Sequence, residues 1–209
     1  MKNNMKLNYT YFVLGIIISA LGISLITKVG LGTSAIASPA YVLSHIFPFS
    51  FGTFSFAVSC VMILIEIAIQ KKNFPIVQYL QFPAGLLLGV LIDFYMLMMQ
   101  SWLIDDYMMK IIVLLIGCAV LGLGVAFQVK GNVLMLPAEG LVRVLAEFFH
   151  KEFGEMKTIF DVVLVTMSII LSFLFLNLII GVREGTVITA LTTGMFSKFF
   201  IKKIMNRLP

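Results

Sequence analysis

Three ionisable residues in the second half of the chain have a spacing that suits the binding of a charged solute. Glu139, Arg143 and Glu147 are four residues apart, so in a helix they share one face. Such a face can hold a charged solute, or its members can pair with one another on an amphipathic interfacial helix. The matching positions of a similar segment in the first half begin with Tyr41 and His45. A solute between the two segments would therefore meet aromatic and imidazole groups on one side and charges on the other.

A second set of polar residues forms a stripe in an otherwise apolar segment. Gln81 and Asp93 stand at its two ends, and Gly85 and Gly89 lie between them at the same four-residue spacing. Glycines on one helical face allow a neighbouring backbone to approach closely. An ionised carboxylate facing lipid would cost several kcal/mol, so we expect Asp93 to face the bundle, water or a partner. It is either a proton or cation site or a residue near the outer interface.

The stripe recurs 105 positions later as Thr186, Ala190, Gly194 and Lys198. This recurrence indicates an internal duplication that reaches the last helix of each half. If the two repeats are inverted in the membrane, Asp93 and Lys198 lie on opposite sides. We therefore predict no ion pair between them.

Two further acids fall within apolar segments, and both read as residues at the edge of a span. Glu66 lies four residues before the polar edge that begins at Gln70. Asp161 opens its predicted helix, where a carboxylate suits the positive end of the helix dipole.

Both halves are interrupted by glycine, small polar residues and proline after a first apolar helix. Such residues free backbone groups that lipid cannot satisfy, so they must lie inside protein or beside water. Paired interruptions of this kind point to the binding site of a transporter, although they can also serve close packing alone. The candidate site residues in these interruptions are Gly30, Gly32, Ser34 and Pro39 in the first half, and Asn132 and Pro137 in the second. With His45, Gln81, Asp93, Glu139 and Arg143 they complete the predicted substrate-binding set.

The composition predicts an integral membrane protein, with the lipid bilayer as its surroundings. Hydrophobic residues make up 60% of the 209, charged residues only 12%, and the mean hydropathy is +1.06. The net charge of +5 comes from basic residues at segment ends, a membrane-topology pattern, so nucleic-acid binding is not expected. Cys60 and Cys118 lie in apolar runs, and neither histidine has metal-ligand spacing. We predict no metal, no cofactor and no enzymatic activity, because no catalytic or phosphate-binding motif occurs.

Segment lengths predict an all-α, polytopic helical bundle of two repeats, residues 1–104 and 105–209. About 20 apolar residues span a bilayer. Two shorter segments, 34–49 and 133–149, are read as re-entrant or partial helices, which leaves Lys71 and Lys72 cytoplasmic together with both termini. The alternative is eight spans in a parallel repeat. The six predicted full spans are 9–28, 53–70, 76–99, 108–128, 158–179 and 182–201.

Several of these segments resemble the YczE/YyaS/YitT group of bacterial membrane proteins. The similarity covers nearly the whole chain, although the longer YitT members add a soluble C-terminal domain that has no counterpart here. The resemblance implies a multi-pass protein of the bacterial inner membrane with a transport-related role, and it names no substrate. It rests on the runs Val29 to Ser34, Phe51 to Phe54, Tyr79 to Pro83 leading to Asp93 and Phe94, and Arg183 to Gly194.

The leading function is a secondary transporter or permease for a small polar or ionic solute bound between the repeats. A second class is a substrate-binding subunit energised by a partner ATPase, as in energy-coupling-factor transporters. Gly15 and Ser19 would then offer a small-residue docking face. A third class is an accessory or regulatory membrane protein that moves nothing. A homodimer is a further option for the partner.

Overall fold

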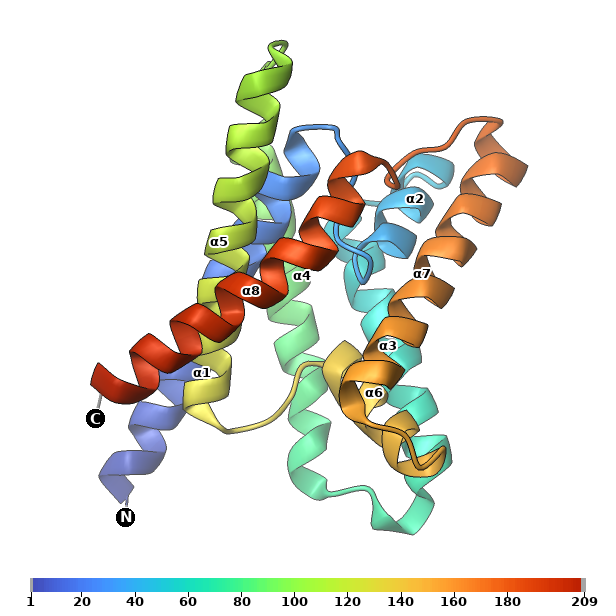
Figure 1. Cartoon of the computed structure of the whole chain (residues 1–209). Helices are drawn as coiled ribbons and strands as arrows, with labels where there is room; N and C mark the ends of the chain where they lie inside the picture. The colour runs from blue at the N-terminus through green and yellow to red at the C-terminus, as the bar shows by residue number, and fades with distance from the viewer. Residues whose placement is uncertain (1, 208–209) are drawn as a thin grey trace.

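The computed structural model describes residues 2–207, with side chains for residues 5–204, and this part of the chain is helical without strands. The predicted all-α bundle is confirmed. The described residues form eight α-helices, arranged as in Figure 1. They are α1 (Lys2–Lys28), α2 (Ser38–Ile46), α3 (Phe51–Gln70), α4 (Gln81–Met98), α5 (Tyr107–Gly131), α6 (Pro137–Phe148), α7 (Phe153–Leu176) and α8 (Glu184–Arg207), with two short 3-10 turns, η1 (Lys71–Asn73) and η2 (Ile76–Leu80), between α3 and α4.

The helix ends follow from local sequence chemistry. Ser50 and Asp106 precede α3 and α5, and each side chain accepts a backbone N–H of the first turn. Asn132 and Asn177 end α5 and α7 in the left-handed conformation, which asparagine adopts more readily than most residues. Prolines occupy the first turns of α2 and α6, where their missing N–H costs no helical hydrogen bond.

Five helical segments are long and apolar enough to cross a membrane: 5–28, 51–73, 76–98, 107–131 and 153–176. They correspond to five of the six predicted spans. The sixth, 182–201, corresponds to α8, which has 24 residues but is not among the five. Its outer surface carries an exposed apolar stripe, Val187, Leu191, Met195 and Phe199.

The two short helices do not reach across a bilayer. At 1.5 Å per residue, the 9 residues of α2 extend about 14 Å and the 12 residues of α6 about 18 Å. The hydrocarbon core is about 30 Å thick. These lengths favour re-entrant or partial helices over the eight-span alternative.

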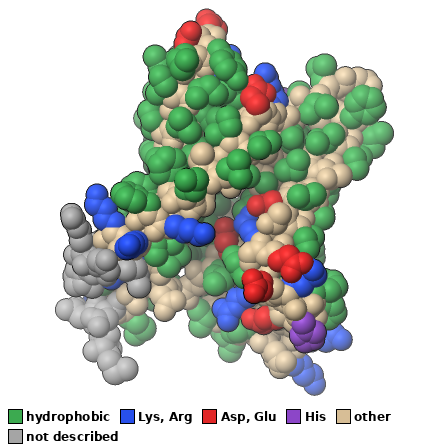
Figure 2. Space-filling model, in the orientation of Figure 1, with side chains coloured by type: hydrophobic (Ala, Val, Ile, Leu, Met, Phe, Trp, Pro, Cys, Tyr) green, Lys and Arg blue, Asp and Glu red, His purple; other side chains and the backbone are tan. Residues whose placement is uncertain are grey.

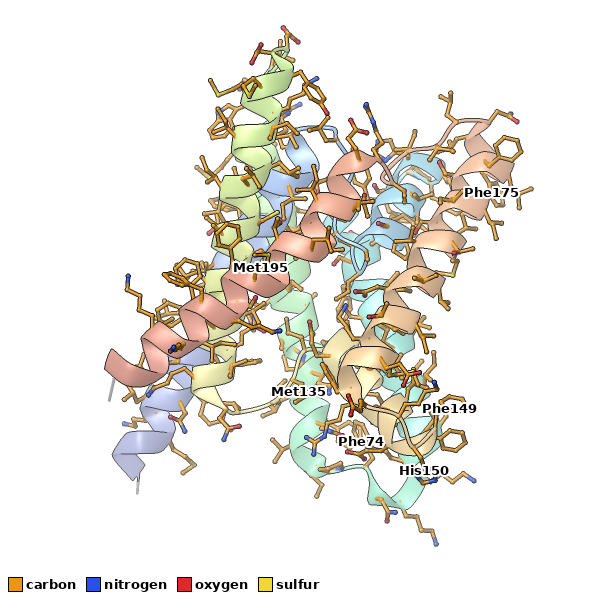
Figure 3. The ribbon with its side chains drawn as sticks, in the orientation of Figure 1. Phe74, Met135, Phe149, His150, Phe175 and Met195 are labelled. Carbon is orange, nitrogen blue, oxygen red and sulfur yellow. The ribbon has the colours of Figure 1, made fainter. Side chains whose placement is uncertain are left out.

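The two halves run in opposite directions. In Figure 1, α1 rises from the end that holds both termini, which we call the lower end, and α5 descends from the opposite, upper end. The chain then continues with α3 downward and α4 upward in the first half, but α7 upward and α8 obliquely downward in the second. Figure 3 shows His150 beside the start of α7 at the lower end and Phe175 at the upper end of the same helix.

The centre of the bundle is a close contact of α1 with α5. A Cβ on Gly22 would lie 2.5 Å from the backbone nitrogen of Leu121, so only glycine permits this approach. Ser19 is buried in the same contact and accepts a hydrogen bond from Gln128 Nε2 at 2.8 Å. A Cβ on Gly15 would also meet α5 backbone. The small-residue face predicted for docking a partner is therefore covered by α5.

Only the short helices are exchanged between the halves. α4 packs on α1 and α8 on α5, within each half. The short helices instead cross over, so that α6 packs on α3 and α2 packs on α7. Each short helix thus lies between its own half and the third helix of the other.

The contact between α3 and α4 is closed, whereas α7 and α8 are separated by a gap. α3 packs closely along α4, whereas α7 and α8 have scarcely any contact within the described chain. Figure 2 shows the surface hollowed between α8 and the α6–α7 pair, with basic and acidic side chains along its borders. The molecule is therefore asymmetric at the places where its two halves would be expected to match.

Candidate functional site

Two cavities lie at opposite ends of the molecule, each beside one of the short helices. The lower cavity has a volume of about 380 Å³ and the upper cavity about 170 Å³. The lower cavity is lined by Ile69, Gln70, Asn73, Pro75, Gln78, Arg143 and Glu147, and the upper cavity by Thr27, Gly30, Gly32, Tyr41, Ile179, Ile180, Gly181 and Arg183. In both, a short helix of one half faces the connection between the third and fourth helices of the other half.

Charged and amide side chains give the lower cavity its polar wall. Arg143 Nε donates to Glu147 Oε1 at 3.1 Å, and both side chains are more than half exposed. An exposed pair of this kind contributes little to stability, so its groups remain available to a ligand. Gln70 and Gln78 line the opposite wall, from the end of α3 and from η2.

A buried carboxylate lies one helical turn above the lower cavity. Glu66 has no exposed surface, and its Oε2 accepts a hydrogen bond from Gln81 Nε2 at 3.3 Å. The sequence predicted a residue at the edge of a span, and Glu66 does lie near the end of α3, but there it is fully buried. α6 covers the edge of α3 and places the backbone of Gly140 against both side chains. That cover comes from the other half of the chain, so local spacing could not reveal it.

Glu139 does not join the Arg143–Glu147 pair but faces α7. It is half-buried, and its nearest charges are those of Lys157 and Asp161, which form an ion pair on α7. The predicted charged face of α6 is thus divided, with one acid turned to α7 and the arginine turned to the cavity.

The first interruption forms the wall of the upper cavity. Gly30 and Gly32 have φ values of 72° and 110°, conformations that side chains disfavour, and a Cβ on Gly32 would also meet the Thr186 hydroxyl at 2.4 Å. Thr33 N donates to Gly181 O at 2.9 Å and Arg183 Nη1 to Gly30 O at 3.2 Å. Backbone groups that the interruption leaves without helical partners therefore form hydrogen bonds with the α7–α8 connection.

An acid stands beside Arg183 at the rim of this upper cavity. A hydrogen bond from its own backbone N–H, and next the adjacent Arg183 guanidinium, hold the pKa of Glu184 below its usual value. Glu184 therefore stays ionised at neutral pH.

Asp93 joins α4 to the start of α3 near the upper end. Its Oδ1 accepts the backbone N–H of Gly52 at 2.7 Å, and its Oδ2 accepts the hydroxyl of Ser50 at 2.5 Å. The positive end of the α3 dipole stabilises the carboxylate there. A Cβ on Gly52 would lie only 2.0 Å from the Gly89 carbonyl oxygen. Asp93 thus lies at the closed α3–α4 contact and away from both cavities.

The remaining candidates stabilise the helix ends at the two interruptions. The Ser34 carbonyl accepts hydrogen bonds from the first residues of α2, and Pro39 and Pro137 are buried in the first turns of their helices. His45 Nδ1 lies 2.9 Å from the Tyr41 carbonyl oxygen and its ring packs edge-on against the Tyr41 ring. Asn132 caps α5. The structure therefore brings Gly30 and Gly32 to one cavity, Arg143 to the other, and Gln81 to Glu66 above it.

Residues outside the predicted substrate-binding set complete both cavities. Gln70 and Gln78 belong to the lower cavity, and Arg183 and Tyr41 to the upper one. For Gln70, Gln78 and Arg183, the signal available in the sequence was their position at or within the α3–α4 and α7–α8 connections. Among the residues with described side chains, no group of three His, Cys, Asp or Glu could hold a metal ion.

Comparison with known proteins gives relatives of uncharacterised function. The model of a family of unknown function, DUF6198, matches residues 6–202. The chain is 25% identical over 196 residues to the uncharacterized protein YyaS of Bacillus subtilis (strain 168), covering 93% of this chain and 92% of the relative. It is 26% identical over 211 residues to the uncharacterized membrane protein YczE of the same organism, covering 100% and 92%. No solved structure matches. The membrane name of one relative and the five apolar helices agree that this is a membrane protein.

Proposed function

The chain belongs to the family of unknown function DUF6198, and we propose that this membrane protein is a carrier for a small polar or ionic solute. The proposal includes no catalysis. The observation that carries it is the unequal packing of two matching helix pairs. Gly52 and Gly89 join α3 to α4 backbone against backbone, whereas a Cβ on Gly154 or Gly194 would meet nothing within 4 Å.

These two pairs occupy corresponding places in the proposed repeats, residues 1–104 and 105–209. Gly154 follows Gly52 by 102 positions, and Gly194 follows Gly89 by 105. The exchange of α2 and α6 between the halves and the opposite directions of α1 and α5 support an inverted repeat. Carriers with inverted repeats move a solute by rocking one half against the other around a fixed site.

The unequal pairs correspond to one state of such a cycle. The α3–α4 contact at Gly52 lies near the upper end, and the α7–α8 gap at Gly154 lies near the lower end. The protein is then closed above and open below, where the lower cavity lies. In the opposite state, α7 would close on α8 and α3 would separate from α4.

We propose that the lower end faces the cytoplasm of a bacterial cell, with both termini on that side of the plasma membrane. The connections at this end carry Lys71, Lys72 and Lys151, and the last turns of α8 add Lys202 and Lys203. The connection between α4 and α5 at the upper end carries Asp105 and Asp106. Short loops on the cytoplasmic side of a membrane carry an excess of lysine and arginine.

Single cysteines should report this orientation in intact cells, in a background where Cys60 and Cys118 are replaced by alanine. We expect cysteines at Phe49 and Gln100 to react with a thiol reagent that does not cross the membrane. Cysteines at Lys72 and His150 should react only after the membrane is permeabilised. Reaction of the Phe49 and Gln100 cysteines only after permeabilisation, together with reaction of the Lys72 cysteine in intact cells, would contradict re-entrant short helices and would fit eight spans.

Transport itself should be measured with the purified chain alone in lipid vesicles. We expect counterflow, the exchange of labelled against unlabelled solute, for at least one of methylammonium, alanine and acetate. Replacing Arg143 by alanine should lower a flux of alanine or acetate, whose carboxylates can accept from the guanidinium, by about tenfold or more, because a hydrogen bond to a charged group contributes about 1.5–3 kcal/mol. The control is Glu155→Gln, which removes an exposed acid that pairs with Lys151 on α7, away from the lower cavity.

The other two function classes predict different outcomes of this experiment. A subunit that needs a partner ATPase would show no flux alone and would copurify with its partner, on a face other than the covered Gly15 and Ser19. An accessory protein would show neither flux nor partner, and Arg143→Ala would leave it unchanged. A homodimer stays a prediction.

A further inference from the structure

Four buried side-chain oxygens near the lower cavity have no hydrogen-bond partner within the described protein. They are Oε1 of Glu66, Gln70, Gln78 and Gln81. A buried acceptor without a partner costs about 1–3 kcal/mol, and a buried carboxylate costs more. Glu66 and Gln81 are without any exposed surface. Four such acceptors together cost several kcal/mol, which indicates a ligand that donates hydrogen bonds to them.

The four residues converge from three segments on one side of α6. Glu66 and Gln70 are one turn apart on the same face of α3, Gln78 lies in η2, and Gln81 begins α4. Gly140 of α6 closes the far side, where a Cβ would lie 2.6 Å from Glu66 Oε1 and 2.8 Å from Gln81 Nε2. Gln70 and Gln78 connect this buried group to the lower cavity. The lower cavity therefore ends at Gln70, one helical turn from Glu66.

The fold does not need a carboxylate at this place. The positions that correspond to Glu66 and Gln81 in the second half are Ser168 and Thr186. Their hydroxyls donate to the carbonyl oxygens of Leu164 and Gly181, so neither is left unsatisfied. The same helices thus pack with small neutral residues in one half, and the first half alone carries the acceptor cluster.

The chemistry of the cluster selects its ligand. Every unpartnered atom is an acceptor, so the ligand must donate hydrogen bonds. The charged groups at the site are Glu66, Glu147 and Arg143, so carboxylates outnumber the one guanidinium, which pairs with Glu147 and not with Glu66. An anion would meet the Glu66 carboxylate, whereas a cation would neutralise it. The cavity of about 380 Å³ lies in the range of small organic ligands and far exceeds the size of a dehydrated metal ion.

We propose that this cluster, Glu66 with Gln70, Gln78 and Gln81, binds the protonated primary amine of a small organic cation. The ammonium group donates to Glu66 and the amide oxygens, and the rest of the molecule occupies the lower cavity. That such an amine is also the transported solute rests on the proposed function above. As a binding site it stands on the geometry alone.

Binding should be measured on the purified full-length chain in detergent, with methylammonium chloride as the probe. At about 100 times its Kd the amine should raise the melting temperature by roughly 5 °C or more. Sodium chloride, potassium chloride and sodium acetate at the same ionic strength should raise it less. In Glu66→Gln the affinity for methylammonium should fall about tenfold or more, because the charged acceptor is lost while the side chain keeps its shape.

Two further variants keep the test decisive if Glu66→Gln folds poorly. Gln78→Met removes one acceptor from the cavity wall and should weaken the amine several-fold. The matched control Glu155→Gln removes an exposed acid from α7 and should bind as the original chain does. The assignment would be overturned if potassium stabilised the protein as much as methylammonium, or if acetate alone stabilised it. It would also be overturned if both Glu66→Gln and Gln78→Met bound methylammonium with unchanged affinity. Amine binding without counterflow would support the binding site and contradict the carrier function. Counterflow without amine binding would support the carrier function and contradict the binding site.

Discussion

A short bifunctional thiol reagent should join cysteines placed at Glu152 and Lys198 and stop transport completely, and cleavage of the link should restore it. In the closed first half, Asp93 bonds to Ser50 and Gly52 at the start of α3. The residues at the corresponding places of the second half are Lys198 for Asp93 and Glu152 for Ser50, both exposed. Glu152 takes the N-cap position of α7 without a capping side-chain hydrogen bond. An ion pair of Glu152 with Lys198 would close the lower end as Asp93 closes the upper end.

The comparison pair is Ser50 with Asp93, also replaced by cysteines in a chain whose Cys60 and Cys118 are alanine. This pair should be linked readily in the lower-open state and should also stop transport. A solute bound in vesicles should change the two linking rates in opposite directions, because a ligand shifts populations between the two states. If the Glu152–Lys198 pair is never linked under any condition, or is linked without loss of flux, α7 does not close on α8.

Alanine at Gly52 and at Gly154 should separate stability from transport. At Gly52 the added methyl would meet the Gly89 carbonyl oxygen at 2.0 Å. Such overpacking costs about 1–3 kcal/mol, so the melting temperature should fall by roughly 3–10 °C. At Gly154 the methyl meets nothing within 4 Å, and alanine favours a helix by about 0.5–1 kcal/mol. That variant should fold at least as stably as the original chain.

Transport should nevertheless fall in Gly154→Ala, because the methyl would obstruct a closed α7–α8 contact. A penalty of about 1–3 kcal/mol on the closed state corresponds to a roughly 5–150-fold effect on its population. Gly194→Ala should behave in the same way. Leu174→Ala, on the exposed upper part of α7, is the control and should keep its flux. Normal counterflow in both glycine variants would mean that the gap stays open throughout.

The sequence by itself determined that this is a polytopic helical membrane protein with two interruptions. Periodic hydropathy, the prolines and the glycines are local properties, and they placed the short helices after their breaks and grouped Gln81 with Asp93 on one face of α4. The recurrence of that stripe at Lys198 also predicted that α8 corresponds to α4. The family resemblance rested on the same runs.

Only the tertiary structure decided which of these polar residues share a site. Glu66 is buried because α6, from the other half of the chain, covers it, and Asp93 serves the α3–α4 contact because the start of α3 lies beside it. The separation of α7 from α8 is likewise set by which helices each of them packs against. Such choices depend on contacts between residues far apart in the chain, which no local spacing contains.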